Sequence, residues 1–167
     1  MRNQKFEQKK NLLEEKVISI GRITKVTAGG RHFRFSATVA VGNRKGLIGI
    51  GSGKANEVPE AIKKAIQAAN KNVIKVALVD NRTIPHEAKA KVGRAVVLIK
   101  PAKEGRGIVA GGAARAVLEL AGIKDIVSKS LGSNTQVNVA KATMDALQML
   151  KTAEHVAELR GKKVEEL

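Results

Sequence analysis

Residues 49–54, Gly-Ile-Gly-Ser-Gly-Lys, have a glycine and lysine spacing that resembles a phosphate-binding loop. A Walker phosphate-binding loop needs a glycine five residues before Gly53 and a hydroxyl residue after the lysine. Ile48 and Ala55 occupy these positions, so the oxygen that would bind Mg²⁺ is missing. The segment 46–49 matches the GxxG of a KH domain, but its middle residues are apolar and lie in a strand-like run. Neither motif predicts a site of its class.

Side chains that carry most enzyme chemistry are sparse. The chain has no cysteine, which excludes disulfides, thiolate metal sites and cysteine nucleophiles. Its three histidines, His32, His86 and His155, are isolated, and no His/Asp/Glu cluster has metal-ligand spacing. Most acidic residues fall on the solvent-facing sides of predicted helices. We therefore expect no catalytic residues, no metal, no cofactor and no small-molecule substrate.

Basic side chains dominate instead. Lys and Arg total 31 against 15 Asp and Glu, a net charge of +16 with a pI near 10.4. Residues 1–72 carry 15 basic and 5 acidic side chains, and the 41 residues from Lys16 to Asn56 hold eight basic residues and no acid. Because solvated surfaces normally mix the two signs, this run predicts a surface that faces phosphate.

The strongest candidate site is a hairpin over residues 22–35. Its two predicted strands carry Arg22, Lys25, Arg31 and Arg34 around Ala28-Gly29-Gly30, where the glycines supply the positive φ of a turn. Such a tip lets the backbone approach phosphate closely. Phe33 and Phe35 alternate with basic residues and are predicted to face the core. With three phenylalanines as the only aromatic residues, no base-stacking platform is expected.

A second glycine-rich segment, residues 104–112, precedes a predicted helix. A helix N-terminus is a natural anion site because its backbone N–H groups point outward. Arg106 and Arg115 favour RNA phosphate or an acidic protein surface as its partner, and a flexible loop without a ligand stays an equal alternative.

Composition bounds the class of protein. Hydrophobic residues make up 43% of the chain, enough for a core. No apolar run approaches the ~18 residues of a membrane span, and no signal-peptide pattern opens the chain. We expect a globular protein in a reducing, cytoplasmic setting, with no membrane partner.

Hydrophobic periodicity divides the chain into an arm and two units. Residues 1–11 are predicted to be a flexible arm. Residues 12–72 form the first unit, with strands over 17–26, 33–41 and 47–51 and a helix that begins near Pro59 and presents an apolar stripe of alanines and isoleucines. This unit is therefore β-β-β-α, closed by packing the helix on an antiparallel sheet.

Residues 73–152 form the second unit. Strands are predicted over 74–79, 95–100 and 126–131, and helices over 113–121, ended by Gly122, and 138–151. Residues 83–91 are a loop or the start of a hairpin. Residues 153–167 are predicted as a short helix ended by Gly161, followed by a charged tail.

Several long blocks resemble one family. These are Gly21 to Ser36, then Val41-Gly42, then Gly49 to Pro59, Glu104 to Glu119, Lys129 to Ser133 and Arg160 to Lys162. In order and spacing they are similar to the bacterial small-subunit ribosomal protein number five, across all but about the first ten residues. The resemblance implies an α+β fold, with an N-terminal double-stranded-RNA-binding-like β-β-β-α domain. It also implies a second α/β sandwich domain with a left-handed βαβ crossover.

The resemblance also implies a function and partners. The protein would be a structural constituent of the small ribosomal subunit that binds small-subunit (16S) rRNA and contacts ribosomal proteins four and eight. It would line the path along which mRNA enters and contribute to translational accuracy, with its hairpin near the spectinomycin site. The residues expected to bind rRNA are Arg22, Thr24, Lys25, Gly29, Gly30, Arg31, Arg34, Arg44, Lys45 and Lys54. Arg106, Gly107 and Arg115 would face protein four.

One position departs from the family pattern: Ala28 precedes the glycine pair where the family commonly has lysine. Two other functions stay open at this point. A free-standing double-stranded-RNA-binding regulator would share the hairpin. A small phosphate-binding enzyme would share the second fold with several kinases, but the missing Walker hydroxyl and missing paired carboxylates argue against it.

Overall fold

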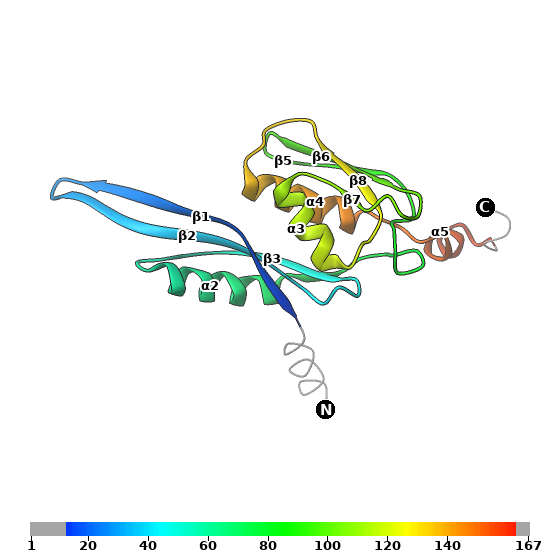
Figure 1. The fold of residues 1–167 in the computed structure, drawn as a ribbon, viewed down its shortest axis with the longest axis horizontal. Helices are drawn as coiled ribbons and strands as arrows, with labels where there is room; N and C mark the ends of the chain where they lie inside the picture. The colour runs from blue at the N-terminus through cyan, green and yellow to red at the C-terminus, as the bar shows by residue number, and fades with distance from the viewer. Residues whose placement is uncertain (1–12, 163–167) are drawn as a thin grey trace, which may run out of the picture.

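The computed structural model describes residues 13–162, which form two four-stranded sheets with helices packed on them (Figure 1). The arm predicted for residues 1–11 and the end of the predicted tail lie outside the described residues. The α+β class and the succession of two units agree with the sequence-based prediction.

The first sheet is antiparallel in the order β1-β2-β3-β4, formed by β1 (Glu14–Thr27), β2 (Gly30–Gly42), β3 (Leu47–Ala55) and β4 (Val73–Lys75). The three predicted strands and α2 (Val58–Lys71) are confirmed, and all three strands are longer than predicted. The strand predicted over 74–79 as part of the second unit is wrong in extent and in the sheet to which it belongs. It is limited to residues 73–75 and pairs with β3, because the chain leaving α2 returns beside that strand.

Helix α2 lies against one face of this sheet, which we call the α2 face. Ala61, Ala65 and Ala69 are fully buried there beneath Val39 and Val41. The glycines at 49, 51 and 53 allow this close approach, since a Cβ at each would overlap the backbone of α2. The glycine spacing that resembles a phosphate loop therefore serves helix packing.

The opposite face of the first sheet is also covered. The alternation in β2 predicts a half-buried strand, yet residues 37–42 are all buried. Ala40 of β2, with Ile48 and Ile50 of β3, belongs to a core shared with helices of the second unit. Those helices cover the face that the alternation leaves to solvent.

The second sheet has the order β5-β6-β8-β7, from β5 (Ala88–Val92), β6 (Ala95–Pro101), β7 (Ile108–Val109) and β8 (Ile126–Ser130). Strands β7 and β8 are parallel and are joined through α3 (Gly112–Ala121), which gives the βαβ unit that the family resemblance implies. Strand β7 is not predicted from the sequence, because its two residues lie within a glycine-rich segment.

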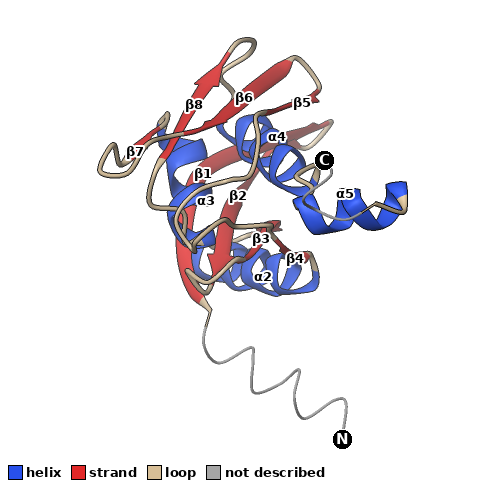
Figure 2. Ribbon diagram, turned by 90° about the vertical axis from the view of Figure 1, so that its right-hand side faces the viewer, coloured by secondary structure: helices blue, strands red, loops and turns tan. Residues whose placement is uncertain are grey.

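Helices α3 and α4 (Gln136–Gln148) lie between the two sheets, and α5 (Ala153–Arg160) follows at the end of the described chain (Figure 2). The apolar stripe predicted for the helix over 138–151 is buried, but the helix ends at Gln148, so the buried Leu150 lies beyond it. Both predicted stops are confirmed: α3 ends before Gly122 and α5 before Gly161.

The two units are joined backbone to backbone at the turn between β2 and β3. The amide of Arg44 donates to the carbonyl of Leu120 (2.9 Å), and the amide of Gly46 donates to that of Ala121 (2.9 Å). The end of α3 therefore closes against this turn, and the first sheet is fixed relative to the second unit.

Candidate RNA interface

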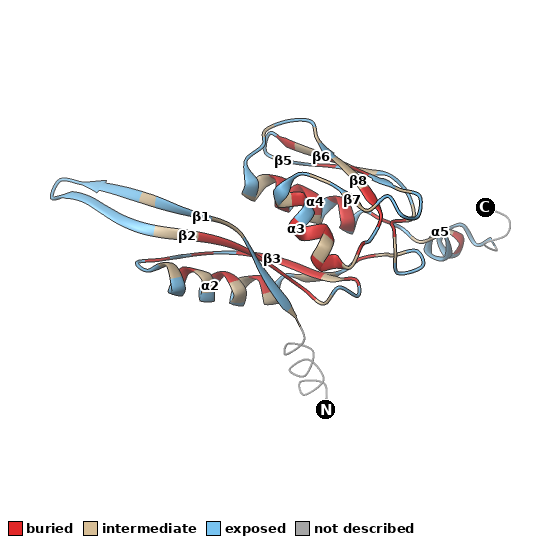
Figure 3. Ribbon diagram, in the orientation of Figure 1, coloured by how far each residue is buried: buried red, intermediate tan, exposed pale blue. Residues whose placement is uncertain are grey.

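The β1–β2 hairpin extends beyond the body of the protein (Figure 3). Residues 22–34 are exposed except for the half-buried Ile23. Helix α2 has 14 residues, about 21 Å of helix, whereas the 13 residues of β2 span about 40 Å. The far end of the hairpin therefore has no helix above it, and its side chains are accessible to a partner.

The register of the hairpin divides its basic side chains between two faces. Cross-strand partners share a face, and the pairs are Lys25 with His32 and Ile23 with Arg34 on the face opposite α2. Arg22 and Arg31 lie on the α2 face, where their partners are Phe35 and Val26. The hairpin thus presents positive charge on both sides.

A basic groove of about 700 Å³ runs along the hairpin, mainly on the face opposite α2. Its charged lining comes from Lys25, Arg34 and Lys54, with His32 between the first two. Thr27 and Asn56 add polar groups, and Thr24 and Phe33 of the α2 face also border the groove. The structure therefore brings Lys54 of β3 to the same groove as the hairpin residues, and His32, which is isolated in the sequence, joins them.

The tip of the hairpin is a two-residue turn of Ala28 and Gly29 between the paired residues Thr27 and Gly30. The Thr27 hydroxyl donates to the carbonyl of Gly30 (3.1 Å). Of the two glycines, Gly30 has a positive φ, 130°, and Gly29 does not, which corrects the prediction for the pair. A Cβ at either position would meet no atom within 4 Å, so the tip is open to solvent.

The prediction that Phe33 faces the core is wrong. Phe35, two residues further along β2, packs partly on the core under α2, as predicted, but Phe33 is 49% exposed. The guanidinium carbon of Arg22 lies 4.6 Å from the centre of the Phe33 ring. Phe33 fails to reach the core because it lies one repeat of the strand beyond the last residue paired with β3, Phe35.

The long acid-free run is less uniform in space than in sequence. Lys16 forms a salt bridge with Glu119 (2.6 Å), and Arg44 forms one with Glu14 (2.8 Å). Arg44 and Lys45 lie at the opposite end of β2 from the tip, about 40 Å away. Within residues 13–162, no salt bridge involves Lys25, Arg31 or Arg34. The uncompensated charge is therefore concentrated on the hairpin.

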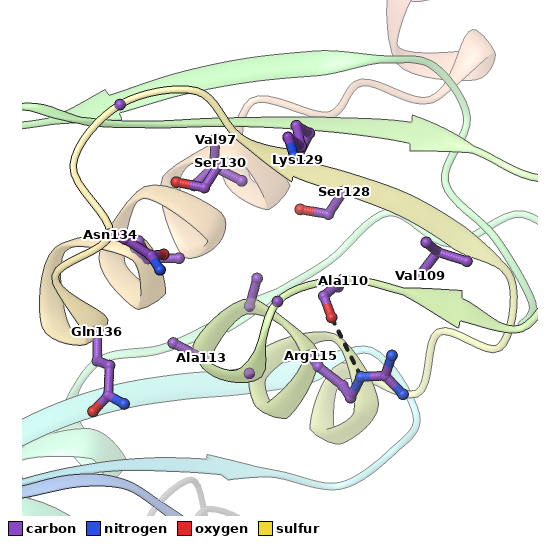
Figure 4. A pocket seen from close by; sticks show the side chains of 15 residues that line it. Val97, Val109, Ala110, Ala113, Arg115, Ser128, Lys129, Ser130, Asn134 and Gln136 are labelled. Atoms are coloured by element: carbon purple, nitrogen blue, oxygen red, sulfur yellow. Dashed lines mark hydrogen bonds between the residues drawn. The ribbon is translucent and has the colours of Figure 1, made fainter.

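The second candidate surface surrounds the start of α3 (Figure 4). A groove of about 690 Å³ lies between Gly111-Gly112 at this helix start and Lys129 of β8. Arg115 borders it, and its Nε donates to the carbonyl of Ala110 (3.4 Å). Arg106 and Gly107 lie apart from this groove, on the loop before β7.

Asp125 holds that loop, and the sequence does not single it out. The residue is 4% exposed, and its carboxylate accepts a hydrogen bond from the Gly107 amide (2.8 Å) and pairs with Arg82 (3.3 Å). The Gly107 hydrogen bond, supported by Arg82, lowers the pKa of Asp125 below its ordinary value despite the opposing effect of burial. Its one signal in the sequence is that it precedes a buried strand, which is too general to identify it.

Other kinds of site find no support in residues 13–162. In this range no three His, Cys, Asp or Glu residues come together as metal ligands. No helix of the described chain is both long and apolar enough to cross a membrane.

These features define the class: an α+β protein of two packed units with a protruding basic hairpin suited to RNA. A family model for the N-terminal domain of ribosomal protein S5 matches residues 13–77, and one for its C-terminal domain matches residues 90–160. The chain belongs to the ribosomal protein S5 family. It is thus a structural protein of the small ribosomal subunit that binds rRNA, and the family is not one of enzymes.

Proposed function

We propose that the protein binds small-subunit rRNA mainly through the β1–β2 hairpin, with Arg22, Lys25, Arg31, Arg34 and Lys54 neutralising phosphates. The observation that carries this proposal is the exposure of the four arginine and lysine side chains of the hairpin, an element that leaves the body of the protein, with the exposed Lys54 of β3 beside them. Thr24, Gly29 and Gly30 contribute polar and backbone contacts at the same place. Arg44 and Lys45 contact rRNA at the other end of β2.

The mechanism is architectural. Lysine and arginine side chains that neutralise phosphates release condensed counterions, which drives binding. A two-stranded hairpin with a bare glycine tip fits where a larger element would collide. Because A-form grooves hide base edges from side chains, recognition rests largely on the shape of the rRNA. Ala28 leaves the tip without a charge of its own, so the charge lies on the flanking strands.

The start of α3 and the loop before β7 form the second proposed surface. We assign Arg106, Gly107 and Arg115 to the contact with ribosomal protein four, and through it to translational accuracy. The exposed Arg106 and Arg115 suit an acidic protein surface. The family resemblance supports the remaining parts of the proposal. The protein contacts ribosomal protein eight, lies on the path of incoming mRNA and near the spectinomycin site, and acts in the cytoplasm.

The test of the hairpin is the salt dependence of rRNA binding. We expect the variant with Arg22, Lys25 and Arg31 replaced by Ala to stay folded and to bind more weakly. The slope of log K against log salt should flatten by roughly 0.7–0.9 for each phosphate that the variant no longer neutralises. The control replaces Lys89, Lys91 and Lys151, which are exposed on the second unit, and removes the same charge. An equal slope in the two variants would place the RNA surface elsewhere.

Two further measurements separate the alternatives. Co-sedimentation with small subunits after a high-salt wash is expected for a ribosomal constituent and not for a free-standing RNA-binding regulator. Arg115→Ala should alter stop-codon readthrough and missense error while subunits assemble normally. Removing one exposed charge pair costs only about 1 kcal/mol, yet this shifts a balanced equilibrium about fivefold. Wild-type error rates with normal assembly would remove Arg115 from the accuracy interface.

A further inference from the structure

Phe33 and Arg22 form an exposed aromatic–cation pair on the α2 face of the hairpin. Thr24 lies directly across from Phe33, and Arg22 lies diagonally across, close enough for its guanidinium to cover the ring at 4.6 Å. Arg31 is the next residue on this face toward the tip. An aromatic ring that is 49% exposed on a protruding element contributes little to the core.

The surroundings of this pair indicate the chemistry of its partner. Unpaired bases in RNA stack on aromatic rings and on arginine guanidinium planes. Arg31 lies one strand repeat, about 7 Å, from Phe33, so a nucleotide whose base stacks on the pair has a cation near its phosphate. Neither hairpin strand carries an acid between Arg22 and Phe35 that would repel that phosphate. The face therefore offers a flat apolar surface and positive charge together.

We propose that the Phe33–Arg22 pair stacks on an unpaired base of the small-subunit rRNA. The proposal rests on the proposed function of the hairpin and adds a residue that is not assigned to RNA binding. The two faces of the hairpin then act differently. Lys25, Arg34 and Lys54, on the face opposite α2, neutralise phosphates, and the α2 face holds one nucleotide by its base. Arg22 serves both stacking and charge, with Phe33 positioning its guanidinium.

Two substitutions separate stacking from charge. Phe33→Leu keeps an apolar side chain without a π face, and Arg22→Lys keeps the charge without a stacking plane. Each full-length variant is titrated against small-subunit rRNA over a range of salt, and the bound rRNA is probed with dimethyl sulfate. We expect both variants to bind at least about fivefold more weakly, the cost of one base that no longer stacks. The salt slope should stay that of the wild type, because the same phosphates are still neutralised.

Controls on the same face keep the result specific. Phe33→Trp retains an aromatic face and should preserve binding. Val26→Ala removes apolar surface from a side chain that is 72% exposed nearby and should have no effect. In the wild-type complex we expect protection of an unpaired base that Phe33→Leu exposes again. Thermal unfolding of each variant verifies that the protein remains folded.

The outcomes distinguish this inference from the function on which it rests. If Phe33→Leu binds and protects as the wild type does, while the Arg22, Lys25 and Arg31 variant fails, the stacking proposal is wrong and the hairpin proposal stands. Loss of binding in Phe33→Leu with a flattened salt slope would show that Phe33 acts only by holding a charge. If neither Phe33→Leu nor the variant with Arg22, Lys25 and Arg31 replaced changes binding, the stacking proposal and the hairpin proposal both fail.

Discussion

The two glycines at the hairpin tip have different reasons to be glycine. Gly30 has a φ of 130°, a conformation that side chains with a Cβ rarely adopt. Gly29 has no such backbone requirement, and a Cβ there meets nothing within 4 Å. The fold therefore does not require a glycine at position 29, which agrees with the proposed approach of rRNA to the tip.

This difference predicts the behaviour of Gly29→Asp. The variant should keep the wild-type melting temperature, because the new side chain extends into solvent, and it should bind rRNA more weakly, because a carboxylate would face phosphate at short range. The measurements are thermal unfolding and rRNA binding, with Gly29→Ala as the control for size. Should Gly29→Asp subunits assemble, translate and respond to spectinomycin as the wild type does, the tip would not contact rRNA.

At the scale of elements, the length of α2 determines which part of the β1–β2 hairpin is buried and which part is exposed. Where α2 covers β2, the strand is core, as at Val39 and Val41. Beyond the end of α2, the same alternation places Phe33 in solvent. The same two strands thus form a packed sheet where α2 covers them and a protruding hairpin where it does not.

The loop before β7 depends on a contact from another element. Asp125, directly before β8, binds the Gly107 amide and Arg82, and its carbonyl accepts a hydrogen bond from the buried Thr83 hydroxyl (2.7 Å). The loop carries Arg106 and Gly107, so the shape of the proposed protein-binding surface depends on this carboxylate.

Asp125→Asn should therefore lower stability in a pH-dependent way. The pKa of Asp125 is lowered below its ordinary value of 3.8 in the folded protein, so the ionised carboxylate stabilises the fold. This contribution is complete above the unfolded value and disappears as pH falls through the lower folded value. We expect the variant to be less stable at neutral pH, with the difference shrinking below about pH 4. Chemical denaturation across pH measures it, beside the exposed Asp145→Asn as control. A difference that persists at the lowest pH would assign the effect to packing.

At the scale of the whole molecule, the two units share a core and a backbone seam. The larger core contains residues from β2 and β3 as well as from α3 and α4. Gly122, at the end of α3, has a φ of 87°, and a Cβ there would overlap the backbone of Arg44 in the β2–β3 turn. The end of α3 in the second unit therefore packs directly on the β2–β3 turn of the first unit.

Gly122→Ala tests this seam. We expect it to destabilise the protein by about 3 kcal/mol or more, since backbone strain adds to a backbone clash. Gly105→Ala is the matched control, because Gly105 has a similar φ of 81° with no atom within 4 Å of its Cβ; strain alone should cost about 1–2 kcal/mol. Calorimetry of the wild type should show one cooperative transition. Two separate transitions, with only one shifted by Gly122→Ala, would mean that the units unfold independently.

The amino-acid sequence alone is enough to predict most elements and the position of the charge. Hydrophobic periodicity identifies β1, β2 and β3, the apolar stripe identifies α4, and Gly122 and Gly161 mark helix ends, because these signals depend on neighbours within a few residues. The basic hairpin is predicted for the same reason: its strands and turn are contiguous in the chain.

The coverage of each face, by contrast, depends on the packing of distant segments. Packing buries both sides of residues 37–42, joins β4 to the first sheet, leaves Phe33 in solvent beside Arg22, and pairs Lys16 with Glu119, 103 positions away in the chain. It also brings Asp125 to Gly107. Each of these depends on which surfaces of whole elements meet, and no short stretch of sequence carries that information. Alternation indicates that a strand has an apolar face and a polar face. The lengths of the helices and the packing of the second unit determine which of these faces is buried in the core.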